Sequence, residues 1–114
     1  GPTFDEADFR VLAQASVDRS FRPAGTARQL AAILASGDRT EALRRLDVPT
    51  LVIHGLVDPL VRPSGGVATA KAVPGARLLM FPDMGHDLPR TRWVEMADAI
   101  ASNAARATAP VATA

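Results

Sequence analysis

The sequence predicts an α/β fold, and three observations support this. Residues 5–46 carry apolar side chains at helical spacing. Two short apolar runs follow, at residues 50–54 and 77–81, and the first is continuous rather than alternating, as in a parallel strand covered on both faces. One helical segment separates the runs, so residues 50–81 are expected to form a strand–helix–strand unit with parallel strands.

Three helices are expected before the first strand. Residues 5–18 begin with acidic side chains, which favour a helix N-terminus, and residues 26–36 place alanines and leucines on one face. The segment 22–25, with a proline and a glycine, is expected to interrupt the helical structure between these two helices. Asp38 and Glu41 have the D-x-x-E spacing of a capping box, which predicts a short third helix.

Two further helices are expected in the second half of the chain. Residues 64–73 form the first, with Ser64 as its N-cap and Pro74-Gly75 as its end. The second covers residues 89–105, with Pro89 in its first turn. Its apolar stripe, which should pack in the core, consists of Trp93, Met96, Ala97, Ile100 and Ala104.

Composition excludes several functional classes. The 114 residues suffice for one small domain, and 13 Lys+Arg against 12 Asp+Glu leave a net charge of +1, so no nucleic-acid partner is expected. The absence of cysteine excludes disulfides and thiolate chemistry. No apolar run is long enough to span a membrane and no signal-like segment opens the chain, so we expect a cytoplasmic protein without a membrane partner.

The chemistry-bearing residues follow the two expected strands. Asp58 lies in the loop after the first strand and His86 in the loop after the second. Parallel strands end at one edge of the sheet, where open α/β sheets bind ligands, so the carboxylate and the imidazole can meet there. Such a pair is half of an acid–base–nucleophile arrangement. The alternative is that Asp58, before Pro59, is only a turn residue and His86 only a surface side chain.

Several segments also resemble a known family. Residues 48–61, VPTLVIHGLVDPLV, look like the seventh strand and acid loop of the α/β-hydrolase family. Residues 74–77, PGAR, followed by 85–89, GHDLP, look like its eighth strand and histidine loop. Residues 18–46 are similar to the end of the cap and the helix before the seventh strand, as in ester hydrolases resembling the anthracycline methylesterases. The resemblance extends over residues 15–105.

The resemblance implies a role for each of the matched residues. Asp58 would be the acid of a Ser-Asp-His triad and His86 its general base, while His54 would be a structural histidine at the strand end. The implied fold is a C-terminal fragment of an α/β-hydrolase. Residues 1–46 would be cap-end and linker helices, residues 47–106 the C-terminal part of the core and residues 107–114 a flexible tail.

The sequence departs from the family at the nucleophile. The family carries its serine in G-x-S-x-G, ahead of the acid and the histidine. None of the serines here has that pair of glycines; they are Ser16, Ser20, Ser36, Ser64 and Ser102. We therefore expect the chain to be inactive alone and to supply the acid and base of a carboxylic-ester hydrolase acting on a small-molecule ester without a cofactor.

Other classes of function remain as alternatives. A non-catalytic fragment could self-associate through the strand at 50–54, whose second side has no partner strand in this chain.

A metal site could be formed by His54, His86 and Asp58 or Asp87, although no close ligand spacing is present. The helices at 26–36 and 39–46 resemble a helix-turn-helix, but acidic neighbours cancel the charge of their arginines, which are Arg28, Arg39, Arg44 and Arg45. Gly65-Gly66 could form an anion-binding nest or, more simply, a turn.

Overall fold

The computed structural model describes residues 1–108. These residues form two compact units, one of residues 4–39 and the other of residues 1–3 together with the chain from residue 40 onward. Within the tail expected at 107–114, residues 107 and 108 form a turn at the end of the last helix, and residues 109–114 lie outside the described residues. The boundary expected after residue 46 divides cap-end helices from the C-terminal part of the α/β-hydrolase core. It describes a correspondence with the family, not a compact unit, and it stays a prediction.

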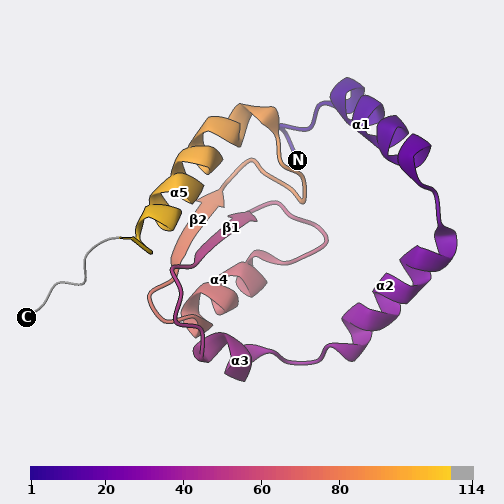
Figure 1. The fold of residues 1–114 in the computed structure, drawn as a ribbon. Helices are drawn as coiled ribbons and strands as arrows, with labels where there is room; N and C mark the ends of the chain where they lie inside the picture. The colour runs from indigo at the N-terminus through magenta and orange to yellow at the C-terminus, as the bar shows by residue number, and fades with distance from the viewer. Residues whose placement is uncertain (109–114) are drawn as a thin grey trace, which may run out of the picture. The chain divides into compact units, whose positions relative to one another are not determined.

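The unit of residues 4–39 contains helices α1 (Glu6–Arg19) and α2 (Pro23–Ala35) (Figure 1). The Asp5 side chain caps α1 by accepting a hydrogen bond from the Asp8 N–H at 3.0 Å, so this helix begins where the acidic cluster predicts. The second helix begins three residues earlier than expected. Pro23 takes its first position, where a helix needs no N–H donor, so this proline starts the helix instead of interrupting the chain.

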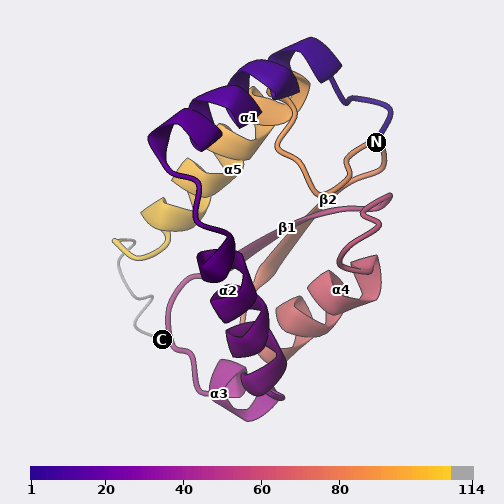
Figure 2. The ribbon, with the colours of Figure 1, turned by 90° about the vertical axis from the view of Figure 1, so that its right-hand side faces the viewer.

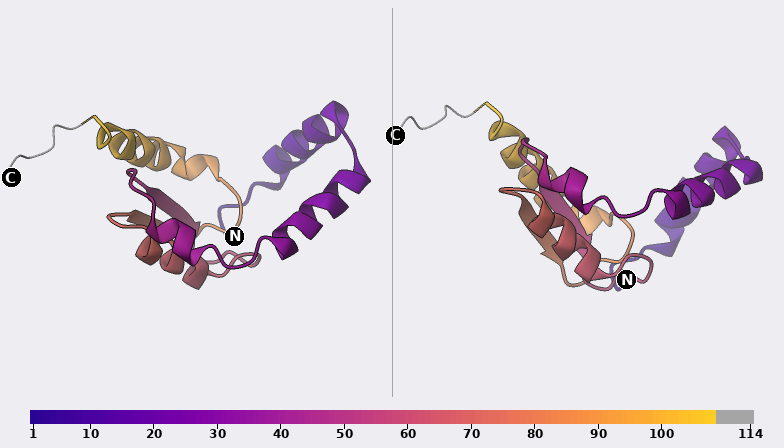
Figure 3. Two further views of the ribbon diagram at one scale, coloured as in Figure 1. Left: turned by 60° about the horizontal axis from the view of Figure 1, so that its bottom comes forward. Right: turned by 90° about the horizontal axis from the view of Figure 1, so that it is seen from below.

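The larger unit is built on a two-stranded parallel sheet. Strand β1 (Leu51–Gly55) pairs with strand β2 (Arg77–Phe81), in a register that runs from Leu51 opposite Arg77 to Gly55 opposite Phe81. Helix α4 (Pro63–Ala72) connects the strands, and helix α5 (Trp93–Ala105) follows them. Figures 1, 2 and 3 show α4 and α5 on opposite faces of the sheet. The expected α/β architecture is confirmed.

Helix α4 differs in detail from the prediction. It begins at Pro63, with Arg62 as its N-cap, so Ser64 lies in the first turn and is not the cap. Gly65 and Gly66 are part of this helix and form neither a turn nor a nest. A Cβ atom at Gly66 would lie 2.9 Å from Cγ of His54, so glycine is needed here to let the histidine ring lie against the helix.

The C-terminal helix begins with a short 3-10 turn, η1 (Arg90–Arg92), which follows Pro89. Of the apolar stripe predicted for α5, only Met96 is buried; it packs with Phe81 and Met84, and the half-buried side chains of Ile53 and Leu79 extend this core. The prediction that Trp93 is a core residue is wrong, because its side chain is 48% exposed. Two strands are too narrow to cover the whole stripe of the helix.

The short helix α3 (Thr40–Arg44) precedes β1 and belongs to the larger unit. Along residues 1–108, no helix combines the length and the hydropathy that crossing a membrane requires.

Candidate active site

The two loops that follow the strands are joined by backbone hydrogen bonds. The Leu56 N–H donates to the Phe81 carbonyl at 2.9 Å, and the Val57 N–H donates to the Met84 carbonyl at 3.2 Å. The loop at 56–61, which carries the acid, is therefore fixed against the loop at 82–89, which carries the histidine.

Gly55 allows this close approach. A Cβ atom at this position would lie 2.1 Å from the Met84 carbonyl oxygen and 2.5 Å from that of Gly85, distances that no side chain can accept. The glycine at the end of β1 thus lets the backbone of the histidine loop cross directly beside the strand. Any larger residue would separate the two loops.

Asp58 uses both of its carboxylate oxygens. Oδ1 accepts hydrogen bonds from the N–H groups of Leu60 at 2.8 Å and Val61 at 2.9 Å, which is the geometry of a turn stabilised by its aspartate. Oδ2 accepts a hydrogen bond from Nδ1 of His86 at 2.8 Å. The side chain is only 4% exposed. Asp58 is therefore a turn residue and the partner of His86 at the same time.

The charge of the Asp58 carboxylate follows from its environment. Burial raises the pKa of Asp58, but the hydrogen bonds from Val61, His86 and Leu60 outweigh it and hold the pKa at about 2. An ionised carboxylate only accepts hydrogen bonds, so Nδ1 of His86 carries a proton, and in the corresponding neutral tautomer the free lone pair is on Nε2. Within residues 1–108 no group hydrogen-bonds to this Nε2, and the side chain is 54% exposed.

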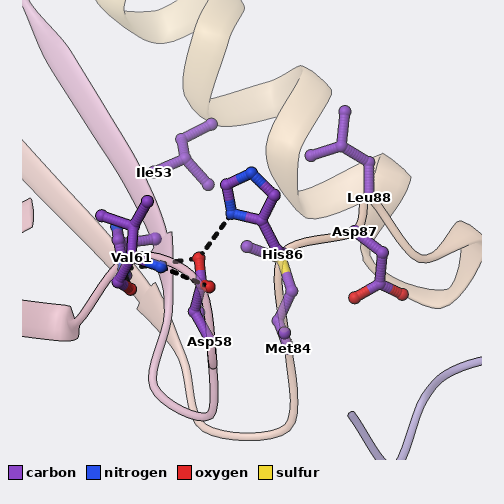
Figure 4. A pocket seen from close by; sticks show the side chains of 10 residues that line it. Ile53, Asp58, Val61, Met84, His86, Asp87 and Leu88 are labelled. Carbon is purple, nitrogen blue, oxygen red and sulfur yellow. Dashed lines mark hydrogen bonds and ion pairs between the residues drawn. The ribbon is translucent and has the colours of Figure 1, made fainter. Parts of the chain in front are cut away.

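The pair lines a pocket of about 360 Å³. Figure 4 shows the ring of His86 with Asp58 on one side and Asp87 on the other, and with Ile53 and Leu88 beside it. Along the part of the chain that the structure describes, no serine, threonine or lysine lines this pocket. The site therefore offers a base oriented by an acid, and its lining contains no hydroxyl or amine nucleophile.

Comparison with known proteins shows the family of the chain. Residues 14–105 match the family of TAP-like proteins, which are α/β-hydrolases. The chain belongs to the α/β-hydrolase family. The match spans α2, α3, both strands, α4 and α5, and therefore includes both loops of the site.

Individual relatives of this α/β-hydrolase chain are esterases by name. It is 34% identical over 70 residues to rhodomycin D methylesterase from Streptomyces peucetius and to its counterpart from Streptomyces sp. strain C5, covering 61% of this chain and 24% of each relative. It is 36% identical over 55 residues to a bifunctional esterase/perhydrolase from Acinetobacter calcoaceticus, covering 47% of this chain and 20% of that protein. The chain thus aligns with a quarter or less of these relatives.

A second contact also fixes the histidine loop, and the sequence did not predict it. The Arg92 guanidinium donates to both carboxylate oxygens of Asp83, at 3.2 and 2.8 Å, and to Glu95 at 2.7 Å, while it lies 5.1 Å from the centre of the Phe81 ring. The hydrogen bonds from Arg92 hold the pKa of Asp83 below its usual range. The Thr3 hydroxyl also donates to the Asp83 carbonyl, at 3.0 Å.

The sequence contains only a weak signal of this contact. Asp83 and Arg92 lie on either side of the GHDLP segment, but no spacing rule pairs opposite charges nine residues apart across a loop and a 3-10 turn. Their pairing depends on the tertiary course of the loop. A charged residue on each flank of a loop that carries a candidate histidine was the only hint available.

The structure also bears on the metal-site and helix-turn-helix alternatives. Nε2 of His54 lies 3.7 Å from Oδ2 of Asp58, beyond hydrogen-bonding distance, and Asp87 lies on the far side of His86 (Figure 4). Among residues 1–108 no group of three or more histidine, aspartate and glutamate side chains is arranged to hold a metal ion. The helix-turn-helix interpretation is not supported, because α3 has five residues, too few for a recognition helix, and belongs to a different unit from α2.

Proposed function

We propose that this chain supplies the acid and the general base of a Ser-Asp-His triad in a carboxylic-ester hydrolase. The serine would belong to a part of the fold outside these 114 residues, so that the chain is the C-terminal portion of a longer enzyme. The observation that supports this most directly is the 2.8 Å hydrogen bond between Oδ2 of Asp58 and Nδ1 of His86, which leaves Nε2 exposed in a pocket.

In the proposed reaction His86 carries the proton in both half-reactions, and Asp58 orients it. Nε2 of His86 takes the proton of the serine hydroxyl while the serine oxygen attacks the ester carbonyl carbon. The same proton then passes to the leaving alcohol, and an acyl-serine remains. A water oxygen then attacks the acyl carbon while Nε2 takes one of its protons, and Nε2 returns that proton to the serine oxygen as the carboxylic acid leaves. Asp58 stays ionised throughout, because its pKa of about 2 lies far below that of an imidazolium.

The substrate class rests on the relatives. Two of the proteins described above are named methylesterases and one an esterase/perhydrolase, which supports a small-molecule carboxylic ester as substrate. The alcohol and acyl pockets would be formed largely by the rest of the fold. A cytoplasmic location stays a prediction.

The test needs the longer polypeptide and this chain side by side. The reading frame upstream of Gly1 should encode a G-x-S-x-G segment, and in that longer protein His86→Ala or Asp58→Asn should lower turnover of a short-chain ester by about 10⁴-fold. The 114-residue chain should give no acyl-enzyme burst and no labelling by a fluorophosphonate. An upstream frame without such a serine, or stoichiometric labelling of this chain, would contradict the proposal.

A non-catalytic alternative is favoured by one observation. In the described part of the chain β1 pairs with β2 alone, which leaves a row of backbone N–H and C=O groups along its other side without a partner strand. Such an edge is a template for pairing, and a two-stranded sheet is marginally stable by itself. On this alternative two copies of the chain associate through residues 50–54. Light scattering over a range of micromolar concentrations measures the mass of the chain in solution. A monomer mass throughout this range would contradict the alternative.

A further inference from the structure

His54, at the end of β1, contacts the acid loop in a way that the proposed triad does not use. Its Nε2 lies 2.9 Å from the carbonyl oxygen of Val61, the last residue of that loop. Its side chain is 11% exposed, and its ring lies against Gly66 of α4. The ring is therefore enclosed between the strand, the helix and the far end of the acid loop.

The contact defines the tautomer of His54. A carbonyl oxygen only accepts hydrogen bonds, so Nε2 of His54 must carry the proton that it donates to Val61. His86 has the opposite tautomer, because its Nδ1 donates to the ionised Asp58. Two imidazoles thus flank one carboxylate, with their protons on different ring nitrogens.

The hydrogen bonds form a continuous chain from His54 to His86. His54 donates to the carbonyl of Val61, the N–H of Val61 donates to Oδ1 of Asp58, and Oδ2 of Asp58 accepts from His86. Val61 is thus held on its carbonyl by one histidine and on its N–H by the acid. The near end of the turn is held to β1 by the Asp58 N–H, which donates to the Gly55 carbonyl at 3.3 Å. If the Val61 carbonyl were released, the far end of the turn would lose its hydrogen bond to β1.

We propose that His54 is a positioning residue for the acid: by donating its Nε2–H to the Val61 carbonyl, it holds the turn that aims Oδ2 of Asp58 at His86. This inference rests on the proposed function for its catalytic consequence, but not for its structural content. In this role His54 acts through Val61 and Asp58, although it is also among the residues that line the pocket.

Gly66 belongs to the same arrangement. Because a Cβ atom there would lie 2.9 Å from both Cγ and Nδ1 of His54, only glycine leaves the ring free to reach Val61. An alanine at this position would push the ring away from the helix and disturb the hydrogen bond without removing any polar group.

The first test uses the unmodified chain. Its two histidines give two ring systems in a long-range ¹⁵N–¹H correlation spectrum, which distinguishes the tautomers at about pH 8, where free imidazoles are neutral. We expect Nε2–H for His54 and Nδ1–H for His86. An Nδ1–H tautomer for His54 overturns the positioning role and leaves the proposed function intact. An Nε2–H tautomer for His86 contradicts the proposed triad instead.

The second test compares two variants. His54→Phe keeps a ring without a donor, and His54→Gln places an amide donor near the position of Nε2. In the phenylalanine variant we expect exchange of the Val61 amide proton to accelerate on the order of tenfold, because the turn loses one hydrogen bond. The glutamine variant should restore slow exchange. If the Val61 amide exchanges in His54→Phe as slowly as in the unmodified chain, the proposal is overturned. It is also overturned if exchange in His54→Gln is as fast as in His54→Phe. If His54→Phe does not fold, exchange in His54→Gln and the tautomer of His54 in the unmodified chain decide.

In the longer enzyme the same variants separate positioning from substrate binding. His54→Phe should lower kcat on the order of tenfold to a hundredfold through misplacement of the acid, with KM unchanged. His54→Gln should recover most of kcat. A change confined to KM, or no recovery with glutamine, contradicts the role of the donor.

Discussion

At the scale of single residues, Asp58 shows why two interpretations of one motif need not compete. The Asp-Pro pair predicts a turn, and the resemblance of the loop after the strand to the acid loop of α/β-hydrolases implies a triad acid. In the structure Oδ1 makes the turn and Oδ2 binds His86. The sequence could predict both contacts because each depends on local spacing or on the common edge of parallel strands. It could not predict that Val61 joins them to His54, since that contact depends on how the loop returns to β1.

The depressed pKa of Asp58 predicts an acid-sensitive loop. The pKa falls from 3.8 to about 2 on folding, so the ionised form is the one that folding favours. The stabilisation it gives is complete above about pH 3.8 and is lost as the pH falls through about 2. We expect the midpoint of urea unfolding to decrease as the pH is lowered from about 3.8 to about 2, and to decrease less in Asp58→Asn. Because Asp83 also has a lowered pKa, the difference between the two proteins is the quantity to measure.

Gly55→Ala should separate the two loops of the site. Its Cβ would lie 2.1 Å from the Met84 carbonyl oxygen, and backbone atoms cannot yield cheaply. We expect a loss of about 1–3 kcal/mol or more in urea unfolding, together with loss of the Asp58–His86 contact in NMR spectra. Gly65→Ala is the matched control, because its nearest contact is an ordinary 3.6 Å and an alanine favours the helix. Equal stability of the two variants would contradict this account of Gly55.

At the scale of elements, the sequence predicts patterns better than boundaries. Strand β2 has the predicted limits, because a short apolar run between glycine and proline admits few alternatives. The starts of α2 and α4 were misplaced for one reason: each begins at a proline, at Pro23 and Pro63, and a proline in a loop has the same local signature as one in a first helical turn. The contact between Asp83 and Arg92 lies beyond any local pattern, because it depends on the tertiary course of the histidine loop relative to η1.

The paired charges of Asp83 and Arg92 should stabilise the histidine loop specifically. Arg92→Gln removes the two-point contact and should increase amide exchange at residues 84–87, while exchange in β1 changes little. Glu95→Gln, which removes the other partner of Arg92 and leaves Asp83 bound, is the control. In a double-mutant cycle with Asp83→Asn, the second substitution should add little to the first. Fully additive effects would show that the pair does not act as a unit.

At the scale of the whole molecule, the composition leaves much apolar surface uncovered. Among the apolar side chains of the described residues, Val73, Phe81, Met84 and Met96 are buried, and so is Pro89. Neither α1 nor α2 buries a residue, and large side chains on α5 are exposed as well. Helical spacing identified which side chains are apolar, but a pattern cannot reveal whether a partner surface exists to cover them.

The direction of the backbone groups in β1 allows a sharp test of association. The Thr50 carbonyl accepts from Arg77 and the Leu56 N–H donates to Phe81, so even-numbered residues face β2 and Leu51 and Ile53 face the free edge. If two copies of the chain pair through this edge, Leu51→Pro should reduce their association, because it removes an N–H from the free edge and keeps the pairing with β2. Val52→Pro is the contrasting variant, since it removes an N–H that faces β2. Light scattering that shows the same mass for Leu51→Pro and the unmodified chain would contradict edge pairing.

The position of Trp93 has a practical consequence. It is the sole tryptophan of the chain, its indole N–H donates to the Leu88 carbonyl at 2.7 Å, and the Arg90 guanidinium lies 5.1 Å from the centre of its ring. Leu88 is two residues beyond His86. The indole is therefore attached to the same loop as the imidazole and is partly open to water, so we expect its emission wavelength to shift when that loop is displaced. The protein carries a built-in fluorophore for its own site, and ligand binding or acidification can be followed optically without a label.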